Sequence, residues 1–484
     1  MILTCWNNDF GVLMSKSVSD ICEVFFNLEE KYNLNYQEIQ GCYAWQLIRM
    51  YLYYDITRRT GTFGAPQQKS LSIFDKIKSF APFLKNSILS NPFSGNAQKD
   101  ILIFDHPRKV IFDGEFKDIY SCFLIDLIEK DYSFEVLEAP YLNKHYTVKK
   151  DYIKYTDRIQ LGSYIYKKRY KINFTDSEKE LISHVKEELE SSFGLNINLE
   201  WILTIHILNF QYDFKKYTEL FTKRKPKMIF VVVAYENQAI VKAAKDLGIT
   251  VCELQHGTIT DYHLGYSYPQ KTRLNGEISY FPDKILTFGD YWINNETSPI
   301  SRDNVIPIGF PYFEVQSKDY INIQAKNNQV LFISQGVIGK YLSKIAYEFA
   351  RQREDLHIIY KLHPGEYGTW RENYPELVND LDNFKVIDNS ETPLYQLFAE
   401  SNYQIGAFST AIYEGLMFNC KTFILNVPGI EYLSDLIDKG YVCQVDNVED
   451  LIDNLESFNP RDYDKNFFFK NFDEKLLKSV IDNG

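Results

Sequence analysis

Apolar residues recur with two different spacings along this chain, and the spacing changes near residue 100. In the segment GCYAWQLIRMYLYYDITRRTG they fall at Trp45, Ile48, Leu52 and Ile56, which is the period of one face of a helix, and the segment ends in a glycine. Beyond residue 100, short continuous apolar runs such as DILIFDHP are bounded by turn residues, as is typical of buried strands. The pattern therefore predicts a mostly helical first part followed by α/β structure.

Strand-like runs then alternate with helix-like segments in two successive blocks. In the first block MIFVVVAYE is followed by the helix-like NQAIVKAAKDLG and the strand-like ITVCELQHG, a βαβ unit that requires parallel strands. The alternation restarts near residue 284 and continues to YLSDLIDKG. Two such blocks predict an α/β fold with two doubly wound, Rossmann-like domains facing each other. The expected division is a helical extension and linker at 1–95, a first domain at 96–282, a second domain at 283–455 and closing helices at 456–484.

An amphipathic segment, SIFDKIKSFAPFLKNSIL, precedes the first strand. Its apolar residues share one face, its lysines lie elsewhere, and Pro82 interrupts it. The pattern favours a short helix packed on the protein core. The alternative is contact with an anionic membrane surface.

The composition narrows the class of protein. Apolar residues make up 45% and aromatic residues 16% of the chain, which suits large cores and wide binding clefts. The net charge of −12 argues against nucleic acid as a partner. Seven scattered cysteines without a C-x-x-C pair are typical of reduced cytosolic thiols. With no signal-peptide pattern and no long apolar run, we expect a cytoplasmic protein.

Open α/β sheets bind ligands beyond the carboxyl ends of their strands, so candidate site residues follow directly after apolar runs. In the second block, YKLHPGEYG places His363, Pro364 and Gly365 there. An imidazole can donate to a phosphate oxygen, and a glycine permits close approach of the backbone. H-P-G is also ordinary turn chemistry, so a simple turn remains the alternative.

Two further strand ends of the same block carry polar residues. IGAFSTAIYEGLMFN places Ser409 and Thr410 between a strand and a helix, where hydroxyls, backbone N–H groups and the helix dipole can hold a phosphate. Glu414 follows one turn later and can accept hydrogen bonds from ribose hydroxyls. A plain N-cap with a surface glutamate explains the motif equally well. FISQG supplies a third strand end that suits a phosphate or a ribose: Ser334, Gln335 and Gly336.

The candidates of the first block are general bases. LQHGT places His256 at a strand end, and HPRKVIFDGEF carries Asp113 and Glu115 on either side of a glycine. An imidazole or a carboxylate in a cleft can take a proton from a hydroxyl. A structural histidine and a simple D-G turn are the alternatives. No phosphate-binding P-loop motif and no G-x-G-x-x-G at a strand end is present, which argues against a P-loop NTPase or a dehydrogenase.

Together these motifs resemble those of the GT-B glycosyltransferases of bacterial surface-polysaccharide assembly, over roughly residues 100–450. LQHGT is similar to the Q-H-G or W-H-G-T element of capsule glycosyltransferases and of CDP-glycerol glycerophosphotransferases. KLHP is similar to the H-P motif shared with sialyl- and Kdo-transferases, and FSTAIYEG to the S-[ST]-x-x-x-E element. The resemblance implies metal-independent sugar transfer, without a further cofactor, from a CMP-, UDP- or GDP-linked donor. It implies a capsule, lipopolysaccharide or related glycan acceptor, free or lipid-linked. The expectation of peripheral contact with the inner face of the cytoplasmic membrane rests instead on residues 73–89 and on the basic runs KHYTVKK, YKKRYK and KRKPK.

The resemblance also implies roles for individual residues. His363, Ser409 and Thr410 would hold the donor phosphates in the second domain, while the first domain binds the acceptor. Asp113 corresponds to the base of sialyltransferase-like members and His256 to that of the glycerophosphotransferases, so the base stays open. Gln255 replaces the tryptophan of the latter family, and the P-L-K that follows their H-G-T is missing, which favours sugar transfer. A polyol-phosphate transferase, a nucleotide-sugar epimerase and a non-enzymatic scaffold are the alternatives.

Overall fold

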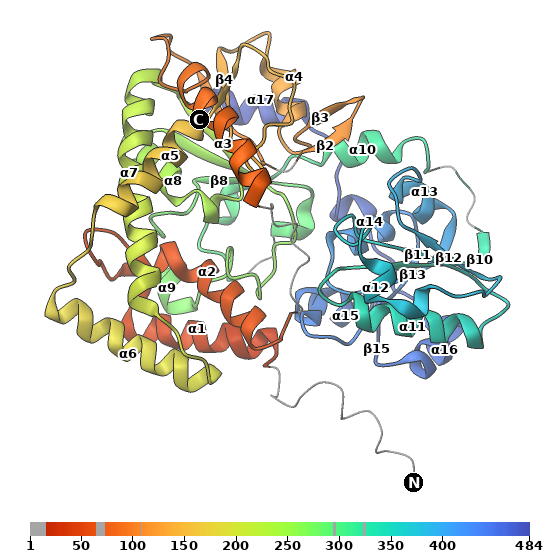
Figure 1. The fold of residues 1–484 in the computed structure, drawn as a ribbon. Coiled ribbons are helices and arrows are strands. Elements are labelled where there is room, and N and C mark those ends of the chain that lie inside the picture. The colour runs from red at the N-terminus through yellow and green to blue at the C-terminus, as the bar shows by residue number, and fades with distance from the viewer. Residues whose placement is uncertain (1–15, 64–72, 108, 294–296, 322, 324–325) are drawn as a thin grey trace.

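Two parallel β-sheets, each between layers of helices, organise the computed structural model, which describes residues 16–63, 73–107, 109–293, 297–321, 323 and 326–484 (Figure 1). The expected fold class, two Rossmann-like domains, is confirmed. The first sheet has the order β5 (Ile153–Tyr155), β4 (Phe134–Glu138), β1 (Ile101–Phe104), β6 (Met228–Val232), β7 (Thr250–Leu254), β8 (Lys284–Thr287), β9 (Val305–Pro307). The second has the order β12 (Phe384–Ile387), β11 (His357–Lys361), β10 (Lys326–Ile333), β13 (Ser401–Gly406), β14 (Lys421–Leu425), β15 (Cys443–Val445).

The apolar runs form these strands because both faces of each sheet are buried. In β1, Ile101 and Ile103 join one apolar cluster, while Leu102 and Phe104 join a second cluster on the opposite face. The strands of the second sheet divide their side chains between two clusters in the same way. Successive side chains of a strand point to opposite faces, so a strand covered on both sides needs an unbroken apolar run.

The helices that cover the sheets precede the first strand, connect successive strands or follow the last strand. Those up to β7 are α1 (Val18–Tyr32), α2 (Ala44–Arg59), α3 (Ile73–Leu89), α4 (Cys122–Ile128), α5 (Asp157–Arg169), α6 (Asp176–Phe193), α7 (Leu199–Arg224) and α8 (Gln238–Asp246). Those that follow are α9 (Gln270–Asn275), α10 (Pro311–Ser317), α11 (Gly339–Gln352), α12 (Trp370–Asn373), α13 (Leu394–Ala399), α14 (Thr410–Met417), α15 (Ser434–Asp438), α16 (Val448–Ser457) and α17 (Glu474–Asp482). A two-stranded antiparallel hairpin, β2 (Val110–Phe112) and β3 (Glu115–Lys117), follows β1.

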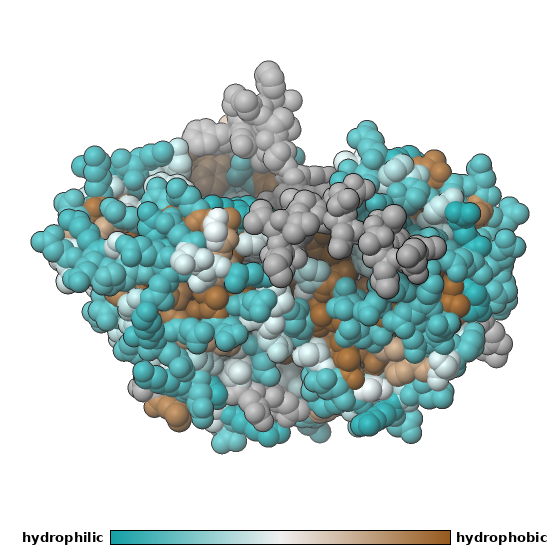
Figure 2. Space-filling view, turned by 90° about the horizontal axis from the view of Figure 1, so that it is seen from below, coloured by the Kyte–Doolittle hydropathy of each residue, from teal (hydrophilic) through white to brown (hydrophobic). Residues whose placement is uncertain are grey.

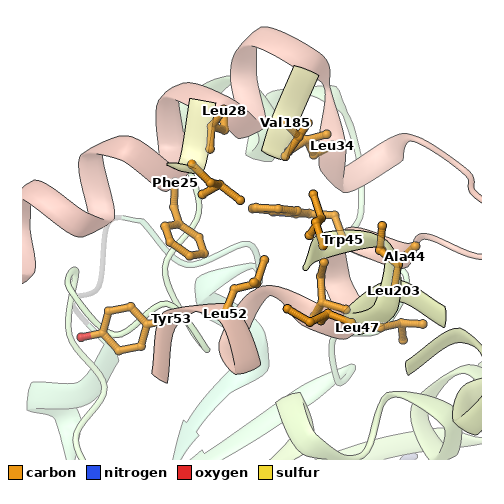
Figure 3. Close-up of a cluster of buried hydrophobic side chains, with 14 of the residues drawn as sticks. Phe25, Leu28, Leu34, Ala44, Trp45, Leu47, Leu52, Tyr53, Val185 and Leu203 are labelled. Atoms are coloured by element: carbon orange, nitrogen blue, oxygen red, sulfur yellow. The ribbon is translucent and has the colours of Figure 1, made fainter. Parts of the chain in front are cut away.

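The helical first part is a structural layer of the first domain and not a separate extension. The predicted face of α2 is buried, with Trp45, Ile48, Leu52 and Ile56 all less than 5% exposed. These residues share one apolar cluster with α1, α6 and α7, as Figure 3 shows for Trp45 between Val185 and Leu52. The sequence could not reveal this union, because α6 and α7 follow more than a hundred residues later.

A buried ion pair holds this helical layer to the loop after β7. Arg49 of α2 and Glu29 of α1 form a salt bridge whose side chains are 2% and 0% exposed. Arg49 also donates to the backbone oxygens of Leu264 and Ser267, and its guanidinium lies 4.2 Å from the ring centroid of Tyr268. Breaking such a pair leaves an uncompensated buried charge. Arg49 therefore fixes the segment that follows the H-G-T motif.

The division between the domains differs from the expected boundary at residue 283. Strands β8 and β9, which follow that residue, extend the first sheet, with β8 in parallel register beside β7. The chain also returns at its end, since Leu477, Val480 and Ile481 of α17 join an apolar cluster of the first sheet. In Figure 1 the blue α17 lies among orange elements of the first domain. An apolar run predicts a strand but not the sheet edge that it joins.

The amphipathic segment forms α3, with Pro82 inside the helix. Its predicted apolar face begins at residues 73–80, whose side chains lie outside the described part of the structure, as does the linker at 64–72. At the other end of the helix, Ile88 and Leu89 are 70% and 68% exposed. Within the described residues, no helix is long and apolar enough to cross a bilayer.

Candidate active site

Candidate residues lie at the carboxyl ends of strands of both sheets, except Asp113 and Glu115, which belong to the β2–β3 hairpin, and Glu414, which lies within α14. His256 follows β7, Ser334 follows β10, His363 follows β11, and Ser409 follows β13. The two domains contact each other through segments next to these strand ends: the hydroxyls of Tyr53 of α2 and Tyr432 after β14 hydrogen-bond, and the ring of His263 after β7 lies 6.3 Å from that of Tyr432. Figure 2 shows a largely hydrophilic face with separate hydrophobic patches on both sides of its middle.

Glu366 organises the strand ends of the second sheet. One carboxyl oxygen accepts from the hydroxyls of Ser334 at 3.0 Å and Tyr374 at 2.6 Å, and the other accepts from the backbone N–H of His363 at 2.7 Å. Glu366 is fully buried. Ser334 is thus buried against Glu366, and its hydroxyl supports the loop instead of facing a ligand. The motif contains Glu366, but its pattern gives no sign of this role.

The H-P turn holds the imidazole of His363 in one orientation. Nδ1 of His363 accepts from the backbone N–H of Gly365 at 3.1 Å, which places the ring proton on Nε2. An Nε2–H at a strand end is the donor that a phosphate oxygen requires. His363 and Pro364 are exposed and Gly365 is partly exposed. The turn interpretation and the ligand interpretation therefore apply together, since the turn sets the tautomer.

The S-T element begins α14 as expected. The Ser409 hydroxyl accepts from the backbone N–H of Ala411 at 3.3 Å and acts as the N-cap, with Thr410 as the first helical residue. Gln335 ties this start to β10, because its side-chain amide donates to the Phe408 carbonyl at 3.1 Å. A Cβ on Gly336 would meet nothing closer than 3.8 Å, so packing alone does not demand a glycine there.

Glu414 is not the surface glutamate of the alternative interpretation. Its carboxyl lies in a partly buried position, 3.4 Å from the Tyr395 hydroxyl. Burial raises the pKa of Glu414 to about 7, and the hydrogen bond from Tyr395 opposes that rise. Raised values of this kind cluster at functional sites.

His256 lies in a ring of tyrosines on the first-domain side. The Tyr235 hydroxyl is 3.4 Å from Nε2, the Tyr266 hydroxyl is 3.4 Å from Nδ1, and Tyr120 donates to the His256 carbonyl at 3.0 Å. Burial lowers the pKa of His256 to about 3, and the neighbouring His263 and His106 lower it further. The imidazole is therefore neutral at neutral pH.

Glu253, inside β7, completes a hydrogen-bonded series with His256. Tyr266 donates its hydroxyl proton to Glu253 Oε1 at 2.6 Å. The Tyr266 oxygen can then only accept from His256, so Nδ1 of His256 carries the ring proton and Nε2 has the lone pair. Burial raises the pKa of Glu253 to about 7. Sequence reasoning missed Glu253; a carboxylate within a buried apolar run was the available signal.

Asp113 and Glu115 lie on the β2–β3 hairpin. Asp113 and Gly114 have φ values of 52° and 78°, the two-residue turn that Asp-Gly favours. The Asp113 side chain is 66% exposed and 3.3 Å from Lys117 Nζ, and Glu115 is exposed. Within the described residues, neither carboxylate hydrogen-bonds or pairs with His256. The hairpin does approach the junction, because Phe112 packs against Tyr312 with ring centroids 5.4 Å apart.

Comparison with known proteins gives remote similarity of structure. No protein-family model and no curated protein matches this sequence. Among solved structures, the UDP-GlcNAc 2-epimerase from Methanocaldococcus jannaschii aligns with a TM-score of 0.47 and 13% identity, over 79% of this chain and 99% of that chain. MurG from Acinetobacter baumannii aligns with a TM-score of 0.45 and 10% identity, over 79% and 99%. A single-residue variant of the wall teichoic acid polymerase TagF aligns with a TM-score of 0.38 and 11% identity, over 86% and 92%.

Proposed function

We propose that this chain is a glycosyltransferase that moves a sugar from a nucleotide-sugar donor to a glycan or lipid-linked glycan of surface-polymer synthesis. The observation that carries the proposal is that each of two contacting domains carries a set of polar residues at the ends of its strands. One set, on the second sheet, offers phosphate donors at His363 and at the start of α14. The other, on the first sheet, offers a neutral imidazole at His256.

The donor contacts follow from the geometry of the second sheet. Nε2–H of His363 and the N–H groups that begin α14 stabilise the negative charge that develops on the leaving nucleotide. The carboxyl group of Glu414 accepts hydrogen bonds from ribose hydroxyls. This assignment places charge stabilisation on the protein's own donors, with no step that uses a metal ion.

His256 is the base that the structure supports better. Its Nε2 lone pair takes the proton of the acceptor hydroxyl while Tyr266 and Glu253 support the Nδ1–H side. A pKa of about 3 describes a weak base, and the Glu253 carboxylate, formed above pH 7, makes the imidazolium easier to form. The acceptor oxygen then bonds to the anomeric carbon, and the bond from that carbon to the phosphate oxygen breaks with its electrons on the nucleotide.

Calorimetry with CMP, CDP, UDP and GDP tests the donor site. We expect one nucleotide to bind and His363→Ala to weaken it at least tenfold, in line with the loss of one charge-assisted hydrogen bond of about 1.5–3 kcal/mol. His357→Ala is the matched control, because His357 is an exposed histidine at the other end of the same strand. Equal binding by the His363→Ala variant and the parent would refute the donor assignment.

One transfer assay separates the candidate bases and the competing reactions. We expect His256→Ala to lower kcat by about 10²–10⁴ and Asp113→Asn to leave it near the parental value. The reverse order would move the base to the hairpin. Product analysis with donor alone identifies an epimerase, and turnover of a CDP-polyol instead of a nucleotide-sugar identifies a polyol-phosphate transferase.

A further inference from the structure

A cavity of about 410 Å³ lies in the first domain, outside the motif-bearing site. It is lined by α2, by α7 and by the segment from Tyr235 to Ile240 that follows β6. Cavities of this volume are in the range that holds small-molecule ligands. Neither the sequence motifs nor the proposed donor site accounts for it.

The polar wall of this cavity carries carboxyl and amide groups from two elements. Asn209 and Asp213 are one turn apart on α7, and Glu236 and Asn237 follow β6. Asp213 Oδ1 is buried and accepts no hydrogen bond within the described residues. An unsatisfied buried acceptor costs about 1–3 kcal/mol, so Asp213 is better explained by a ligand that supplies a donor than by folding alone.

The wall is adapted to neutral and not to anionic ligands. Burial raises the pKa of Asp213 to about 7 and raises that of Glu236, while burial and the nearby Lys167 lower the pKa of His206 to about 4. At neutral pH the wall therefore presents the Asp213 carboxyl group near its titration point and an uncharged imidazole. These groups exchange hydrogen bonds with hydroxyls, and any carboxylate formed among them repels a phosphate.

Tyrosine rings form the open side. Tyr51 and Tyr54 on α2 are 40% and 47% exposed, and the Tyr51 ring lies 4.9 Å from that of His206. Exposed aromatic faces beside hydrogen-bonding carboxyl and amide groups present one apolar and one polar contact surface. A pyranose sugar matches these two surfaces, because it has an apolar C–H face and a rim of hydroxyl groups.

One residue belongs both to this cavity and to the proposed active site. Tyr235 lines the cavity together with Tyr54 and places its hydroxyl 3.4 Å from His256 Nε2. A ligand in the cavity is thus separated from the candidate base by one side chain.

We propose that this cavity is a subsite for an uncharged, hydroxyl-rich saccharide unit of the acceptor, hydrogen-bonded by Asp213, Asn209 and Glu236 and stacked on Tyr51 and Tyr54. The proposal rests on the proposed function and specifies the acceptor side of the same site. It orients the glycan so that its terminal hydroxyl passes Tyr235 on the way to His256.

Saturation-transfer NMR tests the subsite with millimolar methyl glycosides of glucose, galactose, N-acetylglucosamine and N-acetylgalactosamine. We expect at least one to bind the full-length protein without nucleotide, and Tyr51→Ala and Asp213→Ala each to weaken it at least tenfold. Tyr164→Ala is the matched control, because Tyr164 is a 58% exposed tyrosine on α5 that does not line the cavity. Methyl glucuronide is the charged probe, and we expect weaker binding.

The outcomes separate this proposal from the donor assignment. His363→Ala should leave glycoside binding unchanged, and the two cavity variants should leave nucleotide binding unchanged; the latter result also shows that they fold. Failure of all four glycosides to bind, undiminished binding in both cavity variants, or tighter binding of the glucuronide would each overturn the subsite. Failure of the parent protein to bind any of the four nucleotides would instead overturn the proposed function.

Discussion

Glu414→Gln should stabilise the protein at high pH while it weakens nucleotide binding. Burial raises the pKa of Glu414 from 4.5 to about 7, a difference of 2.5. At about 1.36 kcal/mol per pKa unit, this corresponds to about 3 kcal/mol. The folded protein binds this proton more tightly than the unfolded chain does. The stabilising contribution of Glu414 is therefore complete below pH 4.5 and is lost as the pH rises through 7.

Glutamine does not titrate, so the variant does not lose stability as the pH rises through the pKa of Glu414. Relative to the parent, its free energy of unfolding should rise by about 3 kcal/mol between about pH 4 and pH 8. Groups common to both proteins cancel in this difference. Urea unfolding followed by tryptophan fluorescence at several pH values measures it, with Glu391→Gln, an exposed glutamate of the same domain, as the control.

A pH-independent difference between the Glu414→Gln variant and the parent would refute the reasoning, as would a difference that falls with rising pH. The same preparations supply the functional half of the test. An amide keeps one acceptor oxygen but loses the charge, so nucleotide affinity should fall about tenfold, the equivalent of about 1.4 kcal/mol. Gain of stability with loss of binding is the expected cost of a functional buried acid.

Three further changes test other parts of the structure. Arg49→Met leaves the Glu29 carboxylate unpaired in the core and should lower the free energy of unfolding by about 3–5 kcal/mol. Arg58→Met removes a more exposed ion pair and should lower it by less than about 1 kcal/mol. Similar denaturation midpoints for the two variants would contradict this. Glu366→Gln places an amide against three donors and should weaken nucleotide binding about tenfold or more by calorimetry; unchanged affinity would show that the loop holds without it. Replacing exposed Ile88 and Leu89 together by serine should reduce co-sedimentation with anionic vesicles, and equal sedimentation would argue against membrane contact through α3.

Local patterns were sufficient for the elements and for part of the site. The helical face of α2 and the strands β1, β6, β7 and β11 follow from periodicity and unbroken apolar runs, because side-chain burial acts residue by residue. The placement of His256, His363 and Ser409 at strand ends follows from the same patterns, since a polar residue after a buried run marks the point where the chain leaves the sheet.

Burial and partners of the polar groups required the assembled fold. Ser334 and Asp113 have similar local signals to His363, yet one is buried against Glu366 and the other lies exposed on a hairpin. The roles of Glu253 and Glu366 depend on donors from other segments, such as Tyr266 and Tyr374. A carboxylate within an apolar run was the one sign of Glu253 in the sequence, and the H-P motif gave no sign of the role of Glu366.

The chain's own pattern specified two parallel α/β units and the strand ends that carry polar chemistry, because alternation and apolar runs are local properties. It did not specify that β8, β9 and α17 complete the first unit, that α2 joins α7, or that Tyr235 lies between a cavity and His256. Those features depend on contacts between segments far apart in sequence. Such contacts remove water from around Glu414, Glu253 and His256. The loss of water raises the pKa of the two carboxyl groups and lowers that of the imidazole, and the proposed chemistry depends on the resulting protonation states.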